Sequence, residues 1–135
     1  MALPRDCALF ERREMALWSF PIVCDLIGEH YGRAVGVAHP FLRLVVFAHT
    51  QLWQAMLLDD RDAIRRLRGD LSLRLQALDL QHAFADEVND LVLDELMDVV
   101  TQRFHRSPLK ASMCSHILLH IAKNLTYSPE ALTAA

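Results

Sequence analysis

The segment that most restricts how this chain can fold is residues 40–58, PFLRLVVFAHTQLWQAMLL, which is apolar on nearly every side. A helix of this kind is stable only when neighbouring segments cover it all round. Arg43, His49, Gln51 and Gln54 interrupt it, and no second apolar segment of this length occurs, so we do not expect it to cross a membrane. The sequence therefore predicts a helix buried at the centre of the protein.

The composition and length favour an all-α fold. The 135 residues are 53% hydrophobic and include four glycines and five prolines, which argues against disorder and against a turn-rich β sandwich. A chain of this length typically forms one domain and buries enough surface to fold without a disulfide or a metal. We therefore expect residues 1–135 to form a single all-α domain of five to six helices, arranged as a globin-like fold or a helical bundle.

Apolar periodicity and start signals locate the helices. Pro21 and Pro40 each fit the first turn of a helix, where the missing N–H costs nothing, and Ser107 with Pro108 provides a similar start. Gly69 falls inside a predicted helix at a cost of about 1 kcal/mol relative to alanine. We expect it to mark a bend or the close approach of a neighbour. The predicted helices are residues 7–19, 21–33, 40–58, 60–80, 82–105 and 109–125.

The cysteines indicate a reducing compartment. Cys7, Cys24 and Cys114 are far apart, without the CxxC spacing of a zinc site or a redox pair. Isolated cysteines of this kind are commonly buried thiols that serve as packing residues. The first residues, MALPRDCALFERRE, carry charges and no apolar run of signal-peptide length. These features predict a cytoplasmic protein with structural cysteines.

Charge and motif content argue against two functional classes. The net charge of −3 gives no basic footprint for nucleic acid. No serine, cysteine or threonine stands in a recognisable nucleophile motif, and the sequence has no glycine-rich phosphate-binding loop. We therefore expect neither nucleic-acid binding nor enzymatic activity.

Two predicted helices carry charged stripes at helical spacing. The stripes are an acidic one at Asp86, Asp90, Asp94 and Asp98 and a basic one at Arg61, Arg65 and Arg68. One interpretation is that both are solvated faces, because exposed ion pairs contribute only about 0 to 1 kcal/mol. The other is that one stripe binds a protein partner or a second copy of this chain, with charge setting the orientation.

His49 lies in the middle of the most apolar predicted helix, near Phe47 and Trp53. A buried imidazole needs a hydrogen-bond partner or acts as a ligand. It is therefore either a core histidine with satisfied hydrogen bonds or, together with Phe47 and Trp53, part of a pocket for haem or another flat cofactor.

His116 and His120 lie one helical turn apart, a spacing that can hold a metal or line a pocket. No third ligand accompanies them in that predicted helix, so we assign no metal to the chain. The simpler interpretation is two ordinary histidines at the edge of an amphipathic helix.

Three stretches within residues 42–100 resemble a known family: LRLVVFAHTQLWQAM, RRLRGDLSLRLQALDL and NDLVLDEL. They are similar to the sensor globins, the globin-fold input domains of bacterial signalling proteins. Where that family carries its iron-binding proximal histidine, this chain has Leu71, Ser72 or Leu73, which are poor haem ligands. The resemblance therefore implies a globin-like domain that has lost haem and retains the fold for sensing or for protein contacts.

Taken together, these features predict a cytoplasmic, non-enzymatic regulatory module that acts through a protein partner or through self-association. An apolar ligand is compatible with this role. The high apolar content favours a homodimer, because little polar surface remains to coat a monomer. The first alternative is a sensor that binds haem or a small ligand through His49. The second is a subunit of an enzyme complex.

Overall fold

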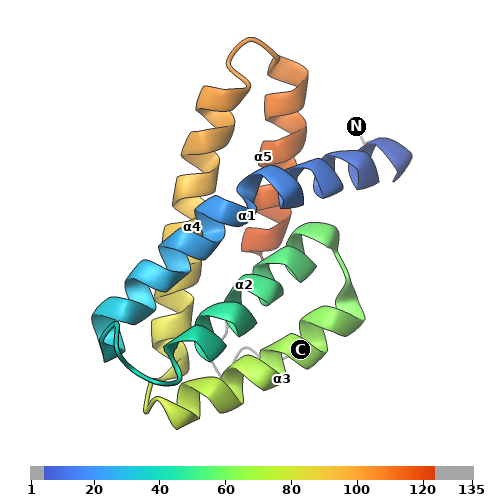
Figure 1. Cartoon of the computed structure of the whole chain (residues 1–135). Helices are drawn as coiled ribbons and strands as arrows, with labels where there is room; N and C mark the ends of the chain where they lie inside the picture. Colours follow the sequence, from blue (N-terminus) through green and yellow to red (C-terminus); the bar gives the residue numbers. More distant parts are fainter. Residues whose placement is uncertain (1–4, 124–135) are drawn as a thin grey trace.

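A computed structural model describes the backbone of residues 5–123 and the side chains of residues 8–123. These residues form five helices and no strand, which confirms the predicted all-α class (Figure 1). The helices are α1 (Arg5–Val35), α2 (Leu42–Leu58), α3 (Arg61–Ala77), α4 (His82–Arg103) and α5 (Pro108–Ala122). None of them is long and apolar enough to cross a membrane.

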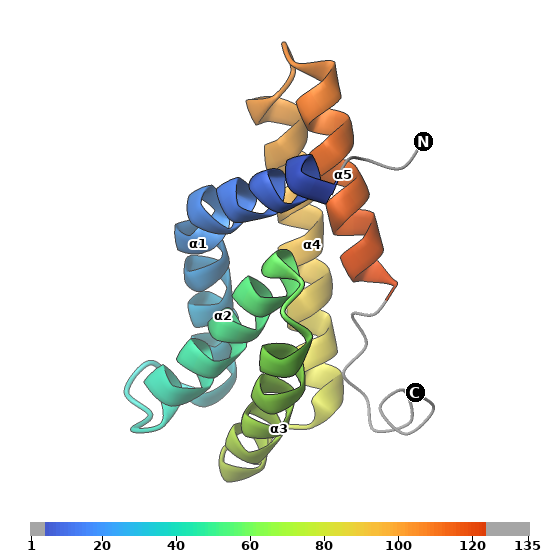
Figure 2. The same cartoon turned by 90° about the vertical axis from the view of Figure 1, so that its right-hand side faces the viewer.

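The helices form two hairpins, α2–α3 and α4–α5, with the long α1 running across both (Figures 1 and 2). Helix α1 packs against α2, α4 and α5, and α2 also contacts α5, so the core lies where these four helices meet. Helix α3 packs extensively only against α2. Its fully buried residues are Leu71 and Leu75 alone.

The predicted boundary at Pro21 is wrong, because α1 continues through this residue without interruption. A proline inside a helix removes the hydrogen bond to the carbonyl four residues earlier, which here belongs to Leu17. Leu17 is 74% exposed, so the turn that contains this carbonyl lies on the surface of the protein. The α1 ribbon bends near its middle, close to where the proline lies in the sequence (Figure 2).

The other helix ends follow from local signals. Gly36, just after α1, has a φ of 92°, a conformation that favours glycine. Asp59 ends α2 in the left-handed conformation, and the Asp60 carboxylate caps α3 by accepting a hydrogen bond of 3.2 Å from the Ala63 N–H. Helix α5 begins at Pro108, one residue before its predicted start. Residues 124–125 of its predicted range lie outside the described residues.

Two expectations about burial need correction. Helix α2 is not covered all round: Phe47 is 65% exposed and Leu44 41%, because α1, α3, α4 and α5 contact other sides of this helix. The apolar pattern of residues 82–105 also predicts that Val88, Leu91 and Val92 face inward. Val88 and Val92 are buried, whereas Leu91 is 44% exposed because it lies one position outside their four-residue repeat. The close approach of a neighbour that the sequence suggested at Gly69 is not observed, because a Cβ atom placed there would meet no atom within 4 Å.

Candidate functional site

Four buried side chains form a hydrogen-bonded network in the core, contributed by α1, α2 and α4. The Tyr31 hydroxyl lies 2.8 Å from Nδ1 of His49. The Nε2 atom of His49 lies 2.7 Å from Oδ1 of Asn89, and Nε1 of Trp53 lies 2.9 Å from the same oxygen. All four side chains are at most 1% exposed. The network therefore joins three helices through polar contacts in an apolar core.

The donors and acceptors of the network follow from Trp53. The indole N–H can only donate, so the Asn89 atom that it contacts must be the carbonyl oxygen. That oxygen also accepts from Nε2 of His49, which must therefore carry the ring proton. In the neutral ring Nδ1 is then an acceptor, and the Tyr31 hydroxyl donates to it.

Burial keeps the imidazole neutral. Desolvation lowers the pKa of His49 from 6.5 to about 4, and the hydrogen bond with Asn89 offsets part of this decrease. Both ring nitrogens are occupied in this state, so ligation of haem iron would require one of these hydrogen bonds to break. The structure brings Trp53 together with His49 in the core, but Phe47 is 65% exposed on another side of α2.

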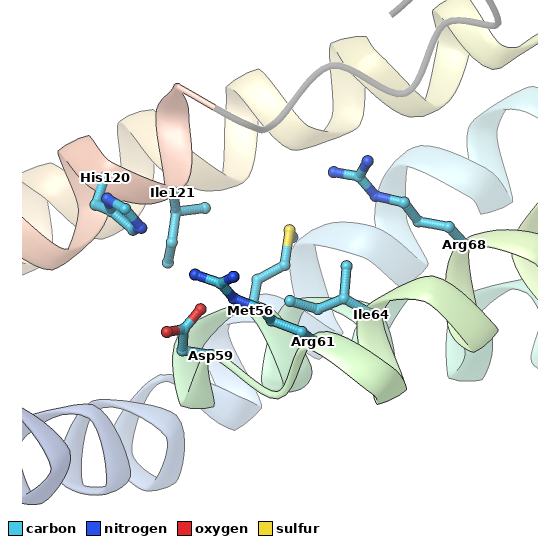
Figure 3. A pocket seen from close by; sticks show the side chains of 7 residues that line it. All are labelled: Met56, Asp59, Arg61, Ile64, Arg68, His120 and Ile121. Carbon is cyan, nitrogen blue, oxygen red and sulfur yellow. The ribbon is translucent and has the colours of Figure 1, made fainter. Parts of the chain in front are cut away.

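A cavity of about 340 Å³ lies between α2, α3 and α5 (Figure 3). Its lining residues are Met56, Asp59, Arg61, Ile64, Arg68, His120 and Ile121. Three of these lining residues, Arg61, Arg68 and His120, were already candidates from the sequence. The fold brings them to one cavity although α4 lies between α3 and α5 in the sequence.

The cavity has a polar end and an apolar middle. Asp59, Arg61 and His120 lie at one end in Figure 3, and Arg68 lies at the other, with Met56, Ile64 and Ile121 between them. The lining contains two guanidinium groups and one carboxylate, so cationic side chains outnumber anionic ones. Within residues 8–123, Arg61 forms no ion pair. The cavity thus has the character of a site for an anion with an apolar body.

The two charged stripes have different surroundings. Asp90, Asp94 and Asp98 are exposed and form no ion pair with any described residue, whereas Asp86 is half-buried. In the basic stripe Arg61 and Arg68 line the cavity, while Arg65 is exposed outside it. The two stripes therefore do not bind each other along their lengths.

Of the two candidate histidines on α5, His116 lies outside the cavity between α2, α3 and α5. His116 and His120 are both exposed on α5, and only His120 lines the cavity. In the part of the chain that the structure describes, no three histidine, cysteine or acidic side chains lie close enough together to hold a metal ion.

Two cysteines are free thiols in different environments. Cys114 is buried between α5 and α1, and its pKa rises from 9.0 to about 11, chiefly through desolvation and further through the nearby Glu11 carboxylate. The thiol is therefore protonated at neutral pH. Cys24 is half-buried at the edge of a groove on the outer side of α1 and α2. The side chain of Cys7 is outside the described residues.

That groove, of about 320 Å³, is almost wholly apolar. It is lined by Phe20, Cys24, Leu42, Arg43, Val46, Phe47, Thr50 and Gln51. The Thr50 hydroxyl is buried without a hydrogen-bond partner among the described residues. Two of the lining residues are large exposed aromatic side chains: Phe20 is 44% exposed and Phe47 is 65% exposed.

Sequence reasoning missed Tyr31 and Asn89, which complete the His49 network. One signal was available for Asn89. It belongs to the repeat Ala85, Val88, Val92 of buried α4 positions, where a polar side chain needs a buried partner. For Tyr31 the sequence contained no comparable signal, because the aromatic ring fits the core by itself.

No family model, curated protein or solved structure matches the chain.

Proposed function

We infer that the chain is a non-enzymatic regulatory module that acts by associating with a second copy of itself. The association would use the α1–α2 face, which we define as Leu17 and Phe20 on α1 and Leu44 and Phe47 on α2. The observation that carries this proposal is the exposure of these four apolar side chains on two adjacent helices beside an apolar groove.

Isolated exposed apolar residues are normal on a soluble protein, but contiguous apolar patches commonly mark interaction sites. The three-residue spacing of Leu17 and Phe20, and of Leu44 and Phe47, places each pair on one side of its helix. Phe20 and Phe47 both line the groove, so the two pairs belong to a continuous surface.

The face contains both a projection and a recess, which suits a twofold dimer. In such a dimer the same surface of both copies pairs, and each contact occurs twice. Phe47 of one copy can enter the groove of the other, where Val46 and Leu42 provide an apolar lining. Aromatic anchors buried in pockets typically dominate the energy of protein interfaces.

The wider context of the proposal comes from the sequence. A regulatory role follows the resemblance to sensor globins, and the free thiols of Cys24 and Cys114 are compatible with a cytoplasmic setting. We do not include a haem in the proposed function, because both ring nitrogens of His49 are already hydrogen-bonded.

Sedimentation equilibrium of the full chain tests the proposal. We expect a dimer at about 10 to 100 µM, because a weak specific interface has a dissociation constant near or below this range. Phe47→Glu should give a monomer, since it would place a charge in the apolar interface.

Leu73→Glu is the matched control, because Leu73 is 67% exposed on α3, away from this face. This variant should associate like the wild type. A monomeric wild type at 100 µM, or an equal effect of the two substitutions, would overturn the proposal.

A further inference from the structure

We propose that the cavity between α2, α3 and α5 binds a small organic carboxylate with an apolar body. Its carboxylate would lie at Arg61, and its body would lie along Met56, Ile64 and Ile121 (Figure 3). This site is separate from the α1–α2 face, and the two share no residue.

The charged side chains of the cavity favour an anionic ligand. Arg61 and Arg68 each contribute a permanent positive charge, and Asp59 contributes one negative charge. Cationic side chains therefore outnumber anionic ones in the lining, which favours an anionic head group over a neutral or cationic one.

Arg61 is the residue best placed to hold the carboxylate. Its guanidinium points into the polar end of the cavity, on the side of Asp59 and His120 (Figure 3), and it forms no ion pair within the described residues. A guanidinium can donate two parallel hydrogen bonds to one carboxylate, which makes this pair stronger than a single neutral hydrogen bond. Arg68, at the other end, contributes to the positive potential without needing to contact the head group.

The apolar wall distinguishes this ligand from an inorganic anion. Met56, Ile64 and Ile121 come from three different helices and lie between the charged ends. They offer a small anion such as phosphate no polar partner, whereas an alkyl or aryl body gains free energy by leaving water there. A volume of about 340 Å³ lies at the lower end of the range for small-molecule sites.

Isothermal titration calorimetry with octanoate, 1-octanol and octylamine tests the head group, because these probes share one alkyl chain. We expect octanoate to bind at one molecule per chain, and the neutral and cationic probes to bind at least about tenfold more weakly, the loss expected for a charge-assisted hydrogen bond. Inorganic phosphate, titrated separately, should bind more weakly than octanoate because it makes no use of the apolar wall.

Two arginines on α3 provide a matched pair of variants. Arg61→Gln should weaken octanoate binding about ten- to a hundredfold. Arg65→Gln removes the same charge one turn away, outside the cavity, and should leave the affinity within about twofold. Circular dichroism of both variants checks that the helices are retained.

Each unfavourable outcome contradicts the proposal directly. Absence of octanoate binding to the folded wild-type chain at millimolar concentration would overturn it. If octanoate and 1-octanol bound with equal affinity, the carboxylate would make no contribution to binding. If inorganic phosphate bound as tightly as octanoate, the apolar wall would make none. An equal loss in Arg61→Gln and Arg65→Gln would show that only the overall charge matters.

Discussion

The Nε2 atom of His49 lies 2.7 Å from Oδ1 of Asn89, a residue forty positions further along the chain, and both side chains are buried. The contact links α2 to α4, while the Tyr31 hydroxyl on the other side of the imidazole links α2 to α1. Because His49 has one donor and one acceptor in its neutral form, it suits this position better than a residue with only one of the two. The network thus specifies how three helices are aligned in the core.

Removal of Asn89 should be strongly destabilising. Asn89→Ala leaves the N–H groups of His49 and Trp53 buried without an acceptor, and each such group costs about 1 to 3 kcal/mol. Urea denaturation should therefore show a decrease of about 2 to 5 kcal/mol in the free energy of unfolding. Gln102→Ala, an exposed change on the same helix, is the control and should stay within about 0.5 kcal/mol. A loss below about 1 kcal/mol in Asn89→Ala would contradict the assigned donors.

Stability should decrease as the pH falls from about 6.5 to about 4. Below pH 6.5 the unfolded chain protonates His49, whereas the folded protein does so only near its pKa of about 4. The unfolded state binds more protons in this window, so the free energy of unfolding falls with decreasing pH, by about 3 kcal/mol from this group at most.

Urea denaturation of the wild type and of His49→Gln across this pH range isolates the contribution of the imidazole. Glutamine keeps a donor and an acceptor but does not titrate. We expect a shallower pH dependence in the variant. The same pH dependence in both proteins would assign the effect to other groups.

Arg12 should stabilise the end of α2. Its Nη1 donates to the carbonyl oxygens of Leu57 at 3.0 Å and of Met56 at 3.4 Å, both in the last turn, where the helix dipole favours positive charge. Arg12→Ala should lower the free energy of unfolding by about 1 to 2 kcal/mol. The neighbouring Arg13 is exposed, so Arg13→Ala should change it by less than about 0.5 kcal/mol. If both substitutions had the same effect in thermal or urea denaturation, the Arg12 contacts would be unimportant.

Two glycines should respond to alanine in opposite directions. Gly69 is exposed within α3, and a Cβ there meets no atom within 4 Å, so Gly69→Ala should raise the free energy of unfolding by about 0.5 to 1 kcal/mol. Gly36 has a φ of 92°, so Gly36→Ala should lower it by about 1 kcal/mol or more. Calorimetric melting of the two variants beside the wild type measures both signs, and destabilisation by Gly69→Ala would refute the expectation.

The sequence predicted the helices best where burial repeats regularly. On α4 the apolar pattern predicted six inward-facing residues, Val88, Leu91, Val92, Leu96, Val99 and Val100. Four of them, Val88, Val92, Leu96 and Val100, are buried because this helix face packs against the core, whereas Leu91 is exposed and Val99 half-buried. Pro21 misled the prediction for a physical reason. Its helix-starting signal is local, whereas the packing of α1 against α2, α4 and α5 stabilises the helix on both sides of the proline.

The candidate sites were less predictable, because their residues meet only through the tertiary fold. Sequence patterns suggested Arg61, Arg68 and His120, but nothing in the spacing indicated that the end of α5 lies opposite the start of α3. The exposure of Phe47 was also unpredictable, because an apolar helix indicates that burial is needed without identifying which side lacks a neighbour.

The weak attachment of α3 has a consequence for local opening. This helix packs extensively against α2 alone and fully buries two leucines, Leu71 and Leu75, so it can separate at lower free energy than the four helices of the core. Its backbone amides should accordingly exchange with deuterium sooner than those of α4, as measured by labelling the intact chain, digesting it with pepsin and weighing the peptides by mass spectrometry. Since α3 also forms one wall of the cavity, a molecule bound there would hold this helix closed and slow its exchange without altering the fold.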